Sequence, residues 1–468
     1  MDRQHKIYFL EFLMDLFLNR KSFVVKSLAL TVTALMMSGA HAATSDKAEI
    51  QQLRKEVEAL KALIQQQSQV QQQQQQVQQQ QQVQLAEVKA QPVAAPVSPL
   101  AGFKSKAGAD VNLYGFVRGD ANYIIEGADN DFGKVADSKG EATDKIRATA
   151  KTTRLGLDFT APVNDAKVGG KLEVDFAGST TDSNGSLRVR HAYVTYNNWL
   201  FGQTTSNFLA SHAPEMIDFS TNIGGGTTRV PQVRYNYKLG PTTQLFVSAE
   251  EGDSSGLTTV AKKDANGNIV KDSSGNTVFV DTDDSIKYSL PVLTAKITQG
   301  YADGKGSASA RALVENYKSK DAHDNQTGWG VAVGTDFKVS DPLKLFADAS
   351  YVVGNSNYLY GSNKAYKVVN GDIEQNKFVA VQVGGTYKIL PNLRSTLAYG
   401  AQFSDDGTDY AKANTSANEK VQQAWLNVIY TPVKPIDLGV EYVNGKRDTF
   451  DGKSYKDNRV GLMAKYSF

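Results

Sequence analysis

The last strand of the chain alternates apolar and polar side chains up to its final residue. One face carries Val460, Leu462, Ala464, Tyr466 and Phe468, and the other carries Arg459, Gly461, Met463, Lys465 and Ser467. Soluble domains rarely end in this way, whereas bacterial outer-membrane barrels often do, because the terminal ring lies in their interfacial girdle of aromatic side chains. The pattern favours a membrane barrel, with an ordinary sandwich strand as the alternative.

The composition fits a barrel better than a helical membrane protein. Mean hydropathy is -0.38 over 468 residues, and no apolar run beyond the leader is long enough to span a bilayer as a helix. Half of each barrel strand faces water, so a barrel gives no strong hydropathy signal. The chain has no cysteine, which fits an exported protein, and its net charge of +2 points to no partner.

The N-terminus reads as a secretory signal peptide over residues 1–42. Arg20, Lys21 and Lys26 precede an apolar core at 27–37, and Ala-His-Ala at 40–42 matches a cleavage site. The acidic residues Glu11 and Asp15 are unusual there, which makes Met14 a candidate for the true start.

Residues 43–90 are predicted to form a periplasmic, glutamine-rich coiled coil. The apolar residues Ile50, Leu53, Val57, Leu60 and Ile64 are spaced alternately by three and four, as in the seam of a coiled coil. The seam lasts about two heptads, so the coil needs another contact to hold its copies together. A disordered spacer is the alternative. A Pro/Ala/Gly linker follows at 91–110.

From residue 111 to 468 the sequence predicts an all-β domain, an antiparallel transmembrane barrel of about 16 strands. Short and long connections alternate along the chain, as in outer-membrane barrels with short periplasmic turns and long external loops. Short connections are predicted at 162–165, 197–198, 239–241, 291, 340–342, 390–392 and 432–435, and long ones between strands near 125 and 146 and at 178–186, 204–228, 252–282, 303–326, 355–375, 405–418 and 446–456. An even strand count places both ends of the barrel in the periplasm, and about 16 strands leave an aqueous channel.

Arginine is concentrated in the first part of the barrel. Those predicted to point inward are Arg118, Arg154, Arg188, Arg190 and Arg234, because each alternates with an apolar residue (Val117, Leu155, Leu187, Val189 and Val233). Guanidinium groups lining a narrow lumen would concentrate anions and bind carboxylates in a fork geometry. The alternative is structural, since Glu173 and Asp175 also point inward and would neutralise part of the cluster.

The segment 204–228, between the fifth and sixth strands, is predicted to fold into the pore as a constriction loop. Phe208, Met216, Ile217 and Phe219 make it too apolar for an external loop. It also carries Glu215 and Asp218, which would face the arginines and create a transverse field. An outer lid or a latch onto a neighbouring subunit is the alternative.

The sequence predicts no enzyme, no cofactor and no nucleic-acid partner. The five histidines are scattered, and no nucleophile elbow, phosphate loop or metal-ligand spacing is present. Asp281, Asp283 and Asp284 are better explained as solvating a polar loop than as a calcium site.

The order of these features resembles that of the DcaP-like trimeric porins, a family of dicarboxylate-selective outer-membrane channels. The resemblance rests on IQQLRKEVEALKALI, the Pro/Ala linker, VNLYGFVRGDANY, RVRHAYVTYNNWLFGQTTSNF and the terminal AKYSF. It implies a homotrimer in the bacterial outer membrane, a 16-stranded barrel, a periplasmic coil and a preference for small dicarboxylic and related aromatic acids.

We therefore expect a porin for passive diffusion of small anions. Its partners would be two further copies of the chain, outer-membrane lipids and lipopolysaccharide, the anionic solutes, and peptidoglycan or a periplasmic protein bound through the coil. A sugar-selective porin is one alternative, although the inward aromatic residues form no obvious row. A structural anchor that tethers the cell wall is the other, although about 16 strands exceed what an anchor needs.

Overall fold

The computed structural model describes residues 103–106, 108–178, 185–284 and 286–468. The predicted signal peptide at 1–42, the coil at 43–90 and most of the linker at 91–110 lie outside these residues. The last part of the linker contributes β1 (Phe103–Lys104), which pairs with the start of β2.

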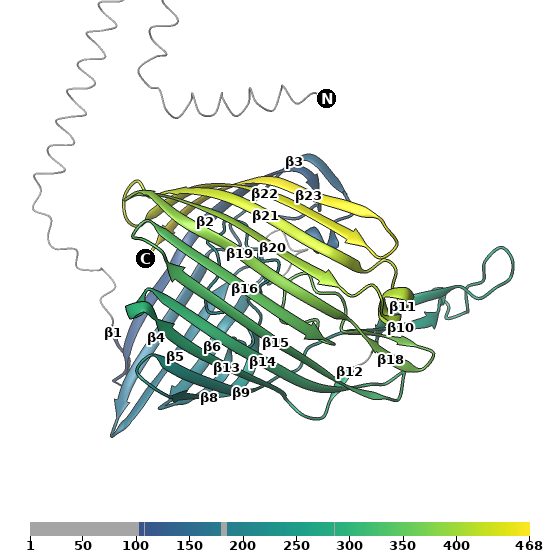
Figure 1. Cartoon of the computed structure of the whole chain (residues 1–468), viewed down its shortest axis with the longest axis horizontal. Helices are drawn as coiled ribbons and strands as arrows, with labels where there is room; N and C mark the ends of the chain where they lie inside the picture. Colours follow the sequence, from purple (N-terminus) through teal and green to yellow (C-terminus); the bar gives the residue numbers. More distant parts are fainter. Residues whose placement is uncertain (1–102, 107, 179–184, 285) are drawn as a thin grey trace, which may run out of the picture. The chain divides into compact units, whose positions relative to one another are not determined.

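The domain is a closed antiparallel barrel of 16 strands, as the sequence predicted (Figure 1). It closes where β2 pairs with β23, from Phe116 opposite Ser467 to Glu126 opposite Asn458. Two of the barrel strands are interrupted and each consist of two labelled segments. One is β3 with β4, which both pair with β2, and the other is β12 with β13, which both pair with β14. The first half comprises β2 (Asp110–Gly127), β3 (Ala142–Thr149), β4 (Arg154–Val163), β5 (Ala166–Asp175), β6 (Arg188–Tyr196), β7 (Trp199–Thr205), β8 (Arg229–Lys238) and β9 (Thr243–Glu250). The second half comprises β12 (Ile286–Tyr288), β13 (Val292–Tyr301), β14 (Gly306–Ser319), β15 (Asn325–Lys338), β16 (Leu343–Val353), β19 (Lys377–Leu390), β20 (Leu393–Ser404), β21 (Asn418–Tyr430), β22 (Ile436–Thr449) and β23 (Ser454–Ser467).

The two faces of the wall have opposite character. The exposed large apolar residues alternate along the strands with buried polar ones, as on β14, where exposed Val314 lies between buried Leu313 and Glu315. This is the reverse of a soluble protein, because the outer face meets lipid and the interior is polar.

One set of predicted connections was wrong. Residues 303–326 do not form a long loop, since most of them belong to β14, and the turn before it contains the 3-10 helix η2 (Ala302–Gly304). Pro291 lies between β12 and β13 on one side of the barrel wall rather than at a turn between neighbouring strands. The error arose because the inward face of β14 is largely polar and its outward face carries mainly small residues. The composition of this strand therefore resembles that of a loop.

Apart from that, the short connections lie at the end that holds both ends of the barrel, and most long ones lie at the other. The external connections at 320–324 and 450–453 are as short as turns, which shortens the predicted loop at 446–456. The largest external loops form a four-stranded sheet of β10 (Gly256–Ala261), β11 (Phe279–Asp284), β17 (Tyr366–Val369) and β18 (Asp372–Gln375). The β10–β11 hairpin extends beyond the barrel strands in Figure 1. The 3-10 helix η1 (Val135–Asp137) and α4 (Asp409–Ala413), which Thr408 caps, complete these loops.

The connection between β7 and β8, residues 206–228, packs against the inner wall. Phe208 and Leu209 share a core with Val292 of β13 and Leu313 of β14. Further along the segment, Met216 packs beside Trp425. Ile217 packs with Ile429 and Met463, and Ile223 packs with Val421. We call this segment the inner loop. Its apolar residues are explained by burial against β13–β23, which leaves β4–β8 as the uncovered part of the wall.

Among the described residues, no helix is long and apolar enough to cross a bilayer.

Candidate functional site: the barrel interior

Backbone and side-chain contacts fix the inner loop to the wall. The Glu441 carboxylate of β22 accepts hydrogen bonds from the backbone N–H groups of Ile217 and Asp218, at 2.8 and 2.7 Å. From β14, Arg311 donates to the carbonyl of Phe208 at 3.2 Å. These anchors lie far apart around the barrel, so the loop is held along its length.

Arg118 belongs to the same anchoring system. Its guanidinium pairs with the Asp120 carboxylate at 2.6 Å, donates to the carbonyl of Ile217 and lies 4.3 Å from the centroid of the Phe219 ring. Both charged side chains are almost fully buried. Arg118 is therefore neutralised and engaged with the inner loop, which leaves little of its charge for a solute.

The two acidic residues of the inner loop do not face the arginines of β4–β8, contrary to our expectation. Glu215 pairs with Arg394 of β20 through both carboxylate oxygens, at 2.8 and 2.7 Å. Asp218 is buried, accepts hydrogen bonds from the N–H groups of Gly133 and Ser220, and its pKa is raised by that burial. The loop residues that are exposed, Ser211 and Ala213, carry no charge. Because Glu215 is paired and Asp218 is buried, these acids do not provide the carboxylates facing the arginines from which we predicted a transverse field.

Three arginines on β4 and β6 share two carboxylates on β5. Arg188 forks onto Asp175 at 2.9 and 2.6 Å, and Arg190 bridges Glu173 and Asp175 at 2.7 and 2.8 Å. Arg154 lies farther away, with Nε 3.4 Å from Glu173. The two acids therefore hold the guanidinium groups in place but do not balance them all.

Two more cations on the neighbouring strands have no carboxylate within 4.0 Å among the described residues. Arg234 of β8 and Lys296 of β13 flank Phe246 of β9, with their charged groups 5.8 and 5.5 Å from its ring centroid. Each is hydrogen bonded only weakly, to Asn207 and to the carbonyl of Leu209 respectively, both at 3.5 Å. These cations stay available to an anion in the lumen.

Arg229, the first residue of β8, was missing from our set of inward residues. It lies within electrostatic range of Arg154, Arg188 and Arg190, and it too has no carboxylate partner in the described part of the chain. Strand alternation predicts that Arg229 points outward, as Pro231 and Val233 do, so this rule could not identify Arg229 as part of the interior. We call Arg154, Arg188, Arg190, Arg229, Arg234 and Lys296 the basic wall.

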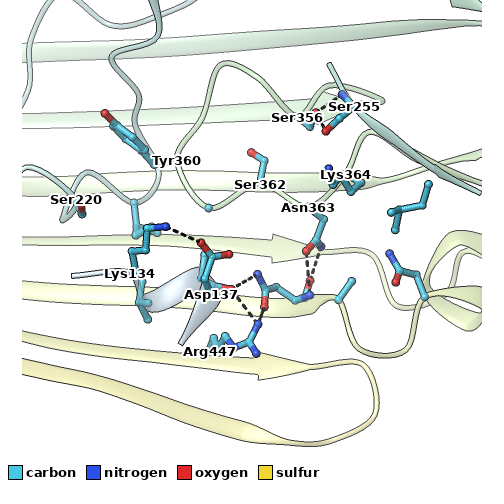
Figure 2. A pocket seen from close by; sticks show the side chains of 18 of the residues that line it. Lys134, Asp137, Ser220, Ser255, Ser356, Tyr360, Ser362, Asn363, Lys364 and Arg447 are labelled. Atoms are coloured by element: carbon cyan, nitrogen blue, oxygen red, sulfur yellow. Dashed lines mark hydrogen bonds and ion pairs between the residues drawn. The ribbon is translucent and has the colours of Figure 1, made fainter. Parts of the chain in front are cut away.

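A polar cavity of about 520 Å³ opens among the external loops (Figure 2). Its basic groups come from Lys134, Lys364 and Arg447, and its acidic one from Asp137. Arg447 donates to the carbonyl of Ala136 and to the Asn418 side chain, both at 2.9 Å, and has no acidic partner within 4.0 Å among the described residues. Tyr360 lines the cavity, and its hydroxyl shares a hydrogen bond of 2.7 Å with the Thr227 hydroxyl of the inner loop, which connects the cavity to that loop.

Within the described ranges, no group of three or more His, Cys, Asp or Glu residues could hold a metal ion.

Comparison with known proteins supplies the family. A family model described as DcaP outer membrane protein matches residues 40–267 and 302–468. The chain belongs to this family. A crystal structure of the outer membrane channel DcaP of Acinetobacter baumannii is 80% identical, covers 79% of this chain and 100% of its own, and superposes with a TM-score of 0.72. This DcaP-family chain is therefore an outer-membrane channel protein with a porin-like barrel.

More distant structures share much less. OmpT of Vibrio cholerae, expressed in the outer membrane, has 14% identity, covers 78% of this chain and 100% of its own, and gives a TM-score of 0.48. An anion-selective porin from Comamonas acidovorans has 14% identity, covers 77% of this chain and 100% of its own, and gives a TM-score of 0.49. A search of curated proteins gave no match.

Proposed function

We propose that this DcaP-family channel conducts small anionic solutes by passive diffusion, with a preference for dicarboxylates. The observation that carries the proposal is the basic wall. It places five arginines and Lys296 along the interior between β4 and β13. Glu173 and Asp175 pair with three of these arginines, and the other three cations have no carboxylate within 4.0 Å among the described residues. An aqueous lumen with this imbalance attracts anions and repels cations.

The mechanism is stepwise binding and release. An anion that passes the external cavity meets Lys134, Lys364 and Arg447, and then the basic wall. Arg154 comes no closer than 3.4 Å to Glu173, and Arg234 donates only to Asn207 at 3.5 Å, so both guanidinium groups keep donors for a further acceptor. Carboxylates can accept from such groups in a fork geometry, and exposure to water keeps each contact weak enough for release.

A dicarboxylate suits this wall because its cations lie on neighbouring strands. Arg234 on β8 and Lys296 on β13 are separated by β9, which corresponds to roughly 10 Å between strand axes. Their side chains converge on Phe246 and shorten that span. One anion with two carboxylates a few carbons apart could then engage two cations at once.

A sugar-selective channel fits the interior less well. It needs free aromatic faces along the lumen, but the ring of Phe116 lies 5.0 Å from the Arg154 guanidinium and Phe246 is flanked by two cations. The inward aromatic rings that border the basic wall are thus already in contact with positive charge.

The assembly we propose is a homotrimer whose N-terminal coils meet in the periplasm, where they could contact peptidoglycan or a periplasmic protein. We assign the chain no catalytic step.

The decisive experiment is the reversal potential of the purified channel in a planar bilayer across a potassium chloride gradient. We expect the sign that corresponds to chloride being more permeable than potassium, and the opposite sign would refute the proposal.

A further inference from the structure

We propose that the outer face of the barrel binds the phosphate groups of lipid A through Lys287 and Lys318. These two residues lie directly opposite each other, Lys287 on β12 and Lys318 on β14. Neither has a carboxylate within 4.0 Å in the part of the chain that the structure describes. The proposal concerns the lipid-facing surface and does not depend on which solute the channel conducts.

Both side chains point away from the lumen. The neighbours Tyr288 and Tyr317, which are also paired across β12 and β14, contact each other edge to face, and Tyr317 is fully buried and stacks on Tyr366. Alternation along the strands therefore turns the next residues, Lys287 and Lys318, outward, and both are exposed.

Their depth matches the headgroup region of the outer leaflet. Below Lys318 on the same face of β14 lies Val314, which is paired with Trp329 of β15, and Trp329 contacts Tyr351 at 5.5 Å between ring centroids. All three are outward and exposed, as expected for an apolar band with its aromatic girdle. Four residues at about 3.3 Å each, on a strand tilted by about 40°, place Lys318 about 10 Å above that girdle.

Like charges that face each other directly across two strands destabilise a sheet unless something compensates them. At a second pair of outward lysines, acidic residues of the barrel itself supply this compensation. Lys446 and Lys456 are also opposite each other, but Lys446 pairs with Asp448 at 2.9 Å and Lys456 with Glu126 at 3.4 Å. The pair formed by Lys287 and Lys318 has no such partner, although acids are close in the sequence. Asp324, for example, accepts instead from Asn325 and Gln326.

Two further lysines extend the row around the same rim. Lys377 lies next to outward Val379 on β19, and Lys420 of β21 places its amine 5.3 Å from the centroid of the exposed Phe403 ring. Neither forms an ion pair within the described ranges. A ligand for this row must carry anionic groups that reach several strands and must lie just above an apolar band. A phosphorylated lipid meets both requirements, and basic clusters at a membrane surface bind such headgroups.

The test compares lipid A retention by the full-length protein and the double variant Lys287→Ser/Lys318→Ser. The protein is reconstituted into phosphatidylcholine vesicles doped with bis-phosphorylated lipid A, and the lipid A that remains bound after extraction is counted by native mass spectrometry. We expect retention to fall about thirtyfold, since each of the two surface lysines contributes on the order of 1 kcal/mol. The control Lys238→Ser/Lys388→Ser removes the same charge from the inward face of the barrel at the periplasmic end and should retain lipid A normally. Both control residues are exposed and form no ion pair with described residues.

Three further arms identify the source of binding. Dephosphorylated lipid A should bind the unaltered protein as poorly as lipid A binds the double variant. Inorganic phosphate at millimolar concentration should not displace lipid A. The variant Lys287→Arg/Lys318→Arg should retain it, which also covers the case in which the serine variant fails to insert. Unchanged retention in the serine variant, an equal loss in the periplasmic control, or equal binding of the dephosphorylated lipid would each overturn the proposal.

Discussion

Glu215 of the inner loop and Arg394 of β20 form a two-oxygen ion pair across the barrel interior, 179 residues apart in the chain. Asp437 lies 3.4 Å from the same guanidinium, and Thr431 also accepts from it. From the sequence we predicted that Glu215 contributes to a field across the pore. In the structure it instead attaches the inner loop to β20, on the side of the barrel opposite the basic wall.

Replacing Glu215 with Gln should therefore loosen the inner loop without changing selectivity. The pair is partly exposed, with 24% and 34% of the two side chains accessible, so we expect a loss of about 1 kcal/mol. Single-channel recording should show greater open-channel noise at an unchanged ratio of anion to cation permeability. If Glu215 instead faced the solute, its neutralisation would raise the anion preference.

Gly400→Ala should displace the inner loop toward the lumen. A Cβ at Gly400 of β20 would collide with the backbone carbonyl of Ile223, and backbone cannot yield as a flexible side chain can. Overpacking of this kind costs about 2 kcal/mol. We expect a lower unitary conductance and a lower unfolding temperature. Gly240→Ala, in a turn where the nearest atom is 3.6 Å away, is the control and should change neither. Wild-type conductance in Gly400→Ala would show that the loop does not limit the pore.

The strand pattern could be predicted from the sequence because it depends on local alternation. The terminal strand, β16, β20 and β22 all alternate apolar and polar residues, and each lies in the wall. β14 escaped prediction because its inward face carries Ser309, Arg311 and Glu315, so that strand resembles a polar loop. Its outward residues Ala310, Ala312 and Val314 carry too small an apolar signal to correct this.

The contacts of the site could not be predicted in the same way. Strand alternation tells which residues face the interior but not which interior residues meet across it. Glu215 contacts Arg394, and Arg118 contacts the carbonyl of Ile217, because of the path that the loop takes across the lumen. The pairing of Arg118 with Asp120 is different, since the two residues are neighbours on one face of β2. That path depends on packing of Phe208, Met216 and Ile217 against distant strands.

Replacing Arg234 and Lys296 together with Gln should reduce the anion preference. Neither cation has a carboxylate within 4.0 Å among the described residues, so no ion pair neutralises either charge. We expect the ratio of chloride to potassium permeability to fall about two- to fivefold at low salt, measured as a reversal potential. The control is Lys344→Gln, whose amine is already paired with Asp336 at 2.7 Å. An unchanged ratio in the double variant would assign the field to other cations.

Deleting residues 43–102 should weaken the proposed trimer without abolishing it. The predicted seam spans only about two heptads, so barrel surfaces should supply most of the contact between subunits. The deletion leaves β1 paired with β2 and the barrel strands intact. Native mass spectrometry in detergent should still show trimers, with a larger monomer fraction on dilution. A clean monomer would show that the coil creates the assembly.

The last prediction concerns the solute. A dianion with two carboxylates a few carbons apart should block the channel better than a monocarboxylate of equal size, because the second contact becomes intramolecular once the first has formed. Water screens each contact in an open lumen, so the second should add only about 1 kcal/mol. That corresponds to roughly a five- to tenfold preference at low salt, which should fade as ionic strength rises. Succinate and butyrate, compared as blockers of the ion current, make the measurement direct. Equal block at low salt would mean that the basic wall is a diffuse anion filter in which no two cations act on one solute.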